Sequence, residues 1–313
     1  MITTVTLNPC IDLTLYLNGL SVGGLNLVES SRSDTCGKGV NVSVVLRALG
    51  MSTMCTGISF DGNGGLLDTF LEEQCIAHDF AVAPGNIRTN IKLMDTIKNE
   101  MTEVNSRGGE VEPRVIGQYL EKLKKHAQKS CIITFSGRVP NGGKNSYADI
   151  YRKSLEAIRD SQLLTIVDAE KEPLRQAILA KPYMIKPNTF ELEETFGCKI
   201  HSKGDIVEAC RGIIKKGVTV VCCSMGGGGA LIADKKEAWF APPMEIEPKG
   251  FQGAGDSVVA GMCKAIRDKG ELKDLLRCGV AAASASLLRE GTLLCRKSDF
   301  ERLLPLVKLE PVK

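Results

Sequence analysis

Short runs of apolar and β-branched residues recur along the chain, and polar residues or turns bound each run. Continuous runs of this kind are typical of parallel strands that are buried on both faces. We therefore predict buried strands over residues 2–7, 131–135, 164–167 and 218–223.

Stretches with apolar residues at helical spacing lie between or beyond these runs. They cover residues 115–130, 147–161, 206–216 and 272–289. Alternation of strand and helix along a chain is typical of a doubly wound, mostly parallel sheet flanked by helices. We predict an α/β fold in which residues 1–313 form a single domain.

Two regions follow a different pattern, because polar and apolar residues alternate in them. They span about residues 12–35 and 88–105, with Gly23-Gly24 and Lys98-Asn99 as turns. Alternation predicts strands with one apolar and one polar face. We expect these regions to form a small antiparallel sheet that projects from the main domain as a lid.

The bulk composition narrows the class of protein. With 313 residues and 43% hydrophobic content, the chain is long enough to bury a large core. Its 40 Lys and Arg residues nearly balance its 37 Asp and Glu residues, which argues against a nucleic-acid-binding arm. No stretch approaches the roughly 18 apolar residues of a membrane span, and no signal-peptide pattern follows Met1. We expect a cytoplasmic protein that binds neither nucleic acid nor a membrane.

The chain has twelve cysteines, most of them in apolar surroundings and none in C-x-x-C spacing. This pattern indicates buried, reduced thiols rather than disulfides or zinc ligands. Cys36 differs because it lies beside a glycine motif. Its thiol is either reactive or purely structural, and we favour the structural role.

The most informative motif is Gly253-Ala254-Gly255-Asp256-Ser257, which opens an apolar stretch at helical spacing. Small residues at a helix start leave backbone N–H groups accessible, and the helix dipole favours an anion there. The Asp256 carboxylate would be placed to accept a proton from an attacking hydroxyl. An ordinary helix cap is the alternative, since Asp and Ser are common capping residues.

A second glycine motif surrounds a lysine at 37–39, just before another helical pattern. Glycines on both sides of Lys38 allow a ligand to approach the backbone at a helix start. Asn41 lies just inside that helix, where its amide would bind sugar hydroxyls. The spacing is not that of a P-loop, which requires four residues between its glycines and a Ser or Thr after its Lys.

Two further clusters follow apolar runs and suit a nucleotide. Lys186, Asn188 and Glu191 offer charge neutralisation and a hard oxygen ligand for a Mg-nucleotide phosphate tail; a capping box formed by Asn188 and Glu191 is compatible with the same residues. The glycine-rich turn at 224–229 resembles nucleotide loops generally, but residues 230–233 after it have a strand pattern. A dinucleotide-binding oxidoreductase is therefore disfavoured.

The order of these motifs resembles that of the PfkB (ribokinase-like) carbohydrate kinases, within the group that phosphorylates fructose 1-phosphate or tagatose 6-phosphate. The resemblance spans nearly the whole chain. It is carried by residues 6–12, 37–42, 89–92, 102–105, 186–188, 253–257, 281–285 and 291–292.

This resemblance implies a ribokinase-like fold and ATP- and Mg²⁺-dependent phosphorylation of a ketohexose phosphate. Fructose 1-phosphate is the first expectation, tagatose 6-phosphate is the alternative, and a homodimer through the lid is implied. Asp256 would be the catalytic base, with Gly253, Ala254 and Gly255 as the anion hole. The sugar phosphate would be held by Asp12, Gly37, Lys38, Asn41, Arg88, Asn90, Ser136 and Arg138; ATP by Lys186, Asn188, Ser224, Gly226, Gly229 and Ser284; and Glu191 would lie near Mg²⁺.

The chain departs from the family pattern at three places. Phe251-Gln252 replaces the usual Thr-Val before the Gly-Ala-Gly-Asp motif, and Leu27 stands where relatives often carry Arg. The run 167–170 replaces the usual Asp-Thr/Ser-Ser-Gly. A sugar-phosphate-binding regulatory protein that lost kinase activity is therefore a rival of a different class.

Overall fold

A ten-stranded sheet forms the centre of the protein. The structure is a computed structural model that describes residues 1–312. The strand order is β14-β13-β12-β11-β10-β9-β8-β1-β4-β5, and the seven strands from β11 to β5 are parallel. The strands are β1 (Ile2–Thr6), β4 (Thr53–Phe60), β5 (Ala77–Ala83), β8 (Ile132–Ser136), β9 (Leu164–Asp168), β10 (Met184–Ile185), β11 (Val220–Ser224), β12 (Ala230–Ala233), β13 (Ala238–Ala241) and β14 (Glu310–Pro311).

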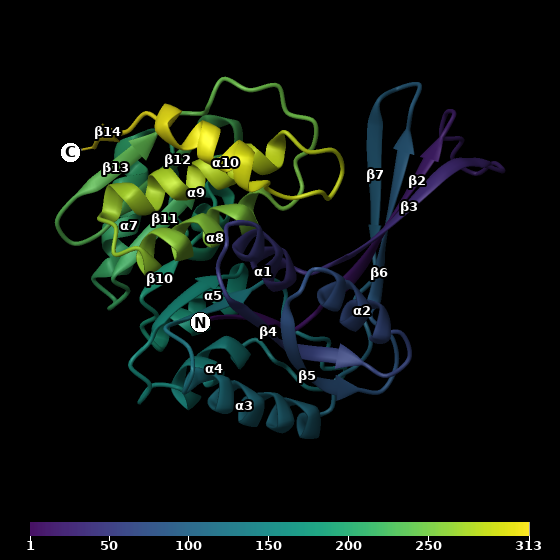
Figure 1. Ribbon diagram of the computed structural model, residues 1–313, viewed down its shortest axis with the longest axis horizontal. Coiled ribbons are helices and arrows are strands. Elements are labelled where there is room, and N and C mark those ends of the chain that lie inside the picture. The colour runs from purple at the N-terminus through teal and green to yellow at the C-terminus, as the bar shows by residue number, and fades with distance from the viewer. Residues whose placement is uncertain (313) are drawn as a thin grey trace.

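Helices cover both faces of this sheet, as the predicted alternation requires. Figure 1 shows α3 and α4 on the face opposite α1, α8 and α9. One face carries α1 (Lys38–Ala48), α8 (Ala254–Arg267), α9 (Leu272–Leu287) and α10 (Lys297–Leu303). The other carries α2 (Gly65–Glu73), α3 (Pro113–Ala127), α4 (Ile150–Ala157), α5 (Lys171–Leu179), α6 (Thr189–Phe196) and α7 (Lys203–Ile214).

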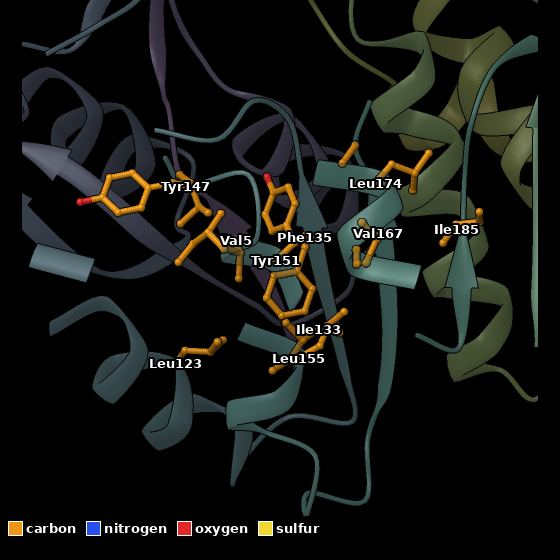
Figure 2. Close-up of a cluster of buried hydrophobic side chains, with 14 of the residues drawn as sticks. Val5, Leu123, Ile133, Phe135, Tyr147, Tyr151, Leu155, Val167, Leu174 and Ile185 are labelled. Atoms are coloured by element: carbon orange, nitrogen blue, oxygen red, sulfur yellow. The ribbon is translucent and has the colours of Figure 1, made fainter. Parts of the chain in front are cut away.

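Successive residues of the central strands enter two separate cores. Ile132 packs under α1 and α8, whereas Ile133 packs with the α3 and α4 side chains; Figure 2 shows the latter cluster around Phe135 and Tyr151. Because side chains of a strand alternate between faces, a strand covered on both sides has no face for water and consists mainly of apolar and β-branched residues. The parallel strands therefore appear in the sequence as short apolar and β-branched runs, in which buried threonines such as Thr3 and Thr4 take the place of some apolar residues.

Four strands form a second, smaller sheet in the order β3-β2-β6-β7. It consists of two hairpins, β2 (Cys10–Leu17) with β3 (Val28–Cys36) and β6 (Arg88–Asp95) with β7 (Glu100–Asn105). Figure 1 shows this sheet projecting from the main domain. We call it the small sheet.

The prediction that the small sheet is antiparallel throughout is wrong at its centre. Each hairpin is antiparallel, but β2 and β6 pair in parallel, so the sheet is mixed. The reason lies in the main sheet: β1 and β5 are parallel strands, so the chain leaves both in the same direction and enters β2 and β6 with the same polarity.

Candidate functional site

A cavity of about 280 Å³ lies between the small sheet and the carboxyl ends of the main parallel strands. Open α/β sheets bind ligands at this edge. All eight residues expected to bind a sugar phosphate line it, together with Gly253. The full lining is Thr6, Asn8, Cys10, Asp12, Cys36, Gly37, Lys38, Asn41, Arg88, Asn90, Lys92, Glu103, Asn105, Ser136, Gly137, Arg138, Gln252, Gly253 and Thr292.

Asp256 is buried in the first turn of α8, beside this cavity. Asn41 Nδ2 donates a hydrogen bond of 2.7 Å to Asp256 Oδ2. Burial raises the pKa of Asp256 to about 6, against the opposing effect of the Lys38 ammonium. A carboxylate with this pKa is ionised at neutral pH and is a stronger base than an exposed Asp, which is what proton abstraction from a hydroxyl requires.

Gly253 caps α8 in the left-handed conformation, with φ of +69°. A Cβ at this position would lie 2.3 Å from Leu294 Cδ2, so both conformation and space require glycine. The first N–H groups of the helix have no partner within it, and the Lys186 ammonium lies beside Gly255, 3.6 Å from where a Cβ would be. This helix start is suited to a polyanion.

Asp168 links the two lysines of the site. It ends β9 fully buried, with Lys186 Nζ 3.1 Å from its Oδ1 and Lys38 Nζ 3.5 Å from its Oδ2. Burial by itself would raise the pKa of Asp168, but the two ammonium groups hold it below its usual value. The same carboxylate raises the pKa of Lys38. Asp168 therefore fixes two cations next to Asp256.

Sequence reasoning did not find this role of Asp168. In the sequence, Asp168 stands out only as part of the departure from the family pattern at 167–170. A usable signal existed, because Asp168 ends a buried parallel strand, as Ser136 does, and such positions converge at one edge of the sheet. Its partners at 38 and 186 are distant in sequence and become neighbours only in the fold.

A second cavity, of about 340 Å³, adjoins the first and shares Asn8, Arg88, Gly137 and Arg138 with it. It adds Arg107 and Lys171, two cations that sequence reasoning also missed. In the first cavity, Ser136 Oγ and Thr6 Oγ1 are buried and make no hydrogen bond to any atom of residues 1–312. The two cavities thus combine cations with unpartnered hydroxyls, as a site for a phosphorylated polyol requires.

Five of the six residues expected to bind ATP lie at the ends of β10 and β11 or directly after them, outside the first cavity's lining: Lys186, Asn188, Ser224, Gly226 and Gly229. Asn188 pairs with Ser224 in an isolated parallel bridge, and Ser224 N donates to Pro187 O at 3.0 Å. Gly226 and Gly229 lie in the turn that follows, both at positive φ, and Ser284 is buried in α9. This grouping is compatible with a nucleotide, and the individual roles stay predictions.

The capping box expected at 188–191 is present. Asn188 Oδ1 accepts from Glu191 N at 2.7 Å, and Glu191 Oε2 accepts from Asn188 N at 2.8 Å. Within residues 1–312 no group of three or more His, Cys, Asp or Glu side chains is arranged to hold a metal. A site with one available carboxylate such as Glu191 fits Mg²⁺ held mainly by nucleotide phosphates.

Cys36 is a structural thiol. It lies opposite Cys10 in the β2–β3 pair, and both side chains are buried. The hydrogen bond with Cys10, together with burial, raises the pKa of Cys36 far above its usual value. Since the thiolate is the reactive form, this environment disfavours reactivity. All twelve cysteines are free in this structure, and eight of them are buried.

The departure at 251–252 leaves Asp256 in the first turn of α8. Phe251 is 77% exposed, and Gln252 lies in the cavity wall. The third departure supplies Asp168, the carboxylate between the two lysines. Leu27 lies outside both cavities, 75% exposed, between β2 and β3 of the small sheet.

A buried carboxylate at a helix start, a cationic cavity and a projecting small sheet on an α/β core are the features of a small-molecule kinase. The chain belongs to the PfkB family of carbohydrate kinases, whose family model matches residues 5–299. It is 32% identical to the 1-phosphofructokinase of Bacillus subtilis and 31% identical to that of Borreliella burgdorferi. Each alignment covers at least 99% of this chain and 99% of the relative.

Solved structures agree with this assignment. A putative phosphofructokinase from Staphylococcus aureus is 28% identical, with a TM-score of 0.85 and coverage of 100% of this chain and 99% of that one. The phosphofructokinase-2 from Escherichia coli, at 24% identity, matches with a TM-score of 0.91 over 98% of this chain and 99% of its own. The ribokinase-like fold is thereby confirmed. No helix among residues 1–312 is long and apolar enough to cross a bilayer.

Proposed function

We propose that this protein is a 1-phosphofructokinase, which transfers the γ-phosphoryl group of ATP to the 6-hydroxyl of fructose 1-phosphate and forms fructose 1,6-bisphosphate. Two observations support it: the full-length similarity to curated 1-phosphofructokinases, and the placement of a buried Asp256 beside a cavity lined by every residue expected to bind the sugar phosphate. The mechanism rests on one observation, the buried position of the Asp256 carboxylate at the start of α8.

In this mechanism Asp256 accepts the proton of the 6-hydroxyl as its oxygen bonds to the γ-phosphorus. The bond between that phosphorus and the β–γ bridging oxygen breaks, and ADP leaves with the electron pair. Asn41 orients the carboxylate through its 2.7 Å hydrogen bond. Gly253, Ala254 and Gly255 offer backbone N–H groups to the transferring phosphoryl oxygens, and Lys186 and Lys38, fixed by Asp168, neutralise charge nearby.

The phosphate already on the acceptor would bind at the far side of the cavity. Arg88 and Arg138 line both cavities there, and guanidinium groups bind phosphate through paired N–H donors. Asp12, Asn90 and Ser136 would bind the sugar hydroxyls, and the backbone at Gly37 would allow close approach. ATP would lie against Lys186, Asn188, Ser224, Gly226, Gly229 and Ser284. Mg²⁺, when bound near Glu191, supplies neutralisation of the nucleotide phosphates.

The small sheet would act as a lid and as the interface of a homodimer. Its exposed apolar side chains are Val22, Leu25, Leu27, Val28, Ile97, Met101 and Val104. An isolated small sheet with an open apolar surface is marginal in water, so packing two of them together would stabilise both. Arg32 on β3 already contacts the main domain, donating to Thr292 Oγ1 at 3.1 Å, and closure would exclude water from the transfer step.

A coupled ADP-release assay tests the proposal. We expect the highest kcat/KM with fructose 1-phosphate, compared with fructose 6-phosphate, tagatose 6-phosphate and ribose at saturating MgATP. Preference for tagatose 6-phosphate would establish the alternative acceptor in the same cavity. Nucleotide and sugar-phosphate binding without turnover of any acceptor would instead support the regulatory protein.

A further inference from the structure

A buried ion pair lies in the part of the cavity that the small sheet provides. Lys92 Nζ bonds to Asp12 Oδ2, and Asn90 Nδ2 donates to Asp12 Oδ1 at 2.8 Å. The side chain of Lys92 is 5% exposed and that of Asp12 is 11% exposed. Asn90 in turn accepts a 2.8 Å hydrogen bond from Arg88 Nη1. Lys92, Asp12, Asn90 and Arg88 therefore form one connected row, and all four line the cavity.

The register of the small sheet builds this row. β2 and β6 pair in parallel, with Cys10 opposite Arg88, Asp12 opposite Asn90 and Thr14 opposite Lys92. Residues two apart on a strand share a face, so Arg88, Asn90 and Lys92 all point to the side where Asp12 lies. A shift of one residue between the strands would separate them.

The charges in this row bear on the kind of acceptor that the cavity admits. Asp12 is expected to bind sugar hydroxyls, yet an uncompensated carboxylate in a small cavity would repel a phosphorylated sugar. A buried charge without a partner is also costly to the fold. Lys92 cancels that charge, and the two hydrogen bonds from Lys92 and Asn90 engage both carboxylate oxygens and so fix their direction.

We propose that Lys92 is a positioning residue that acts through Asp12: it orients this carboxylate for the acceptor hydroxyls and makes its charge compatible with a phosphorylated acceptor. The inference rests on the proposed function of the cavity. The role proposed for Lys92 differs from that of Lys38 and Lys186, whose ammonium groups are paired with Asp168 next to Asp256.

The test compares Lys92→Met, which removes the charge at similar length, with Lys92→Arg, which keeps it. Loss of one charge-assisted hydrogen bond typically weakens binding by about ten- to hundredfold. We expect Lys92→Met to raise the KM for fructose 1-phosphate by at least about tenfold, with the KM for ATP within about twofold of wild type, and Lys92→Arg to recover most of the loss. Lys98→Met, an exposed lysine in the β6–β7 turn, is the matched control and should change neither constant.

A double-mutant cycle separates action through Asp12 from direct contact with the substrate. If Lys92 acts through Asp12, then Asp12→Asn combined with Lys92→Met should bind fructose 1-phosphate as well as Asp12→Asn alone. Additive losses would assign Lys92 to direct substrate contact and overturn the proposal. The double variant carries no buried unpaired charge, so it keeps the comparison usable where Lys92→Met alone fails to fold; thermal unfolding checks each variant.

Failure of this inference is distinguishable from failure of the proposed function. Active wild-type enzyme with an unchanged KM in folded Lys92→Met refutes only the role of Lys92. If the wild type turns over no acceptor, calorimetric titration with fructose 1-phosphate replaces the KM: weaker binding to Lys92→Met then supports the inference, and no binding to the wild type overturns both.

Discussion

Asp256 is buried, accepts one hydrogen bond and lies near two ammonium groups. Replacing one of its carboxylate oxygens by an amide nitrogen therefore tests its role as the base. Asp256→Asn keeps the shape of the side chain but cannot accept the hydroxyl proton. General-base catalysis contributes about 10²–10⁴-fold, so we expect kcat to fall by at least about a hundredfold while ATP and sugar-phosphate binding persist. A coupled ADP-release assay measures kcat, and calorimetric titration measures the binding of ATP and sugar phosphate. A loss of less than about tenfold would refute the assignment of the base.

The raised pKa of Asp256 also predicts a pH dependence of stability. Burial raises this pKa from 3.8 to about 6, so ionised Asp256 costs the folded state stability at neutral pH and the cost disappears as pH falls toward the unfolded value. Asp256→Asn carries no charge. It should be more stable than wild type at pH 7, by up to about 3 kcal/mol, and the difference should vanish below about pH 4.

Denaturant unfolding of both proteins across pH 4–8 checks this prediction without substrate, whose phosphate ionises in the same range. A stability difference that does not change between pH 5 and 7 would show that the folded-state pKa of Asp256 is not raised.

The start of α8 shows what a short element demands of its sequence. Gly253→Ala forces a side chain into the left-handed region and into Leu294. Strain of this kind costs about 1–3 kcal/mol, and any shift of the helix start moves the N–H groups offered to the phosphoryl group. We expect a lower melting temperature and a kcat reduced by at least about tenfold, approaching the roughly 10²–10³-fold loss that follows removal of one oxyanion-hole donor.

Gly261→Ala is a useful companion for Gly253→Ala. It also lies in α8, where a Cβ would meet Cys278 O at 2.3 Å, but away from the cavity lining. It should lower stability without lowering the kcat of the protein that stays folded. Equal effects of the two variants on kcat would argue against a specific role for the helix start.

At the same scale, the sequence predicts some elements far better than others. β1, β8, β9 and β11 are short runs rich in apolar and β-branched residues, and the predicted strands agree with them to within two residues at either end. β4 does not match this pattern because, although it is nearly all buried, Gly57 and Ser59 separate its apolar residues. The parallel pairing of β2 with β6, and the contact of Asp168 with Lys38 and Lys186, depend on segments far apart in sequence, and no local pattern encodes them.

For the whole molecule, the exposed apolar side chains of the small sheet predict association. We expect a homodimer at micromolar concentration and a more compact particle when ATP and sugar phosphate are both added. Sedimentation velocity and small-angle scattering measure these two properties. Val28→Glu with Met101→Glu, at positions 48% and 51% exposed, should give a folded monomer. A wild type that is a strict monomer with no ligand-dependent compaction would contradict both expectations.

The two hairpins of the small sheet are joined to the main domain by four separate passages of the chain: from β1 into β2, from β3 into α1, from β5 into β6 and from β7 toward α3. A lid joined to its domain by a single hinge can rotate through a large angle and is prone to domain swapping between molecules. A sheet connected at four points should tilt through a smaller angle, and its exchange between molecules would require the chain to leave the main sheet at several places. If the proposed homodimer forms, we therefore expect each subunit to retain the cavity residues of its own chain on dissociation, and dilution should lower the efficiency of closure rather than destroy the site.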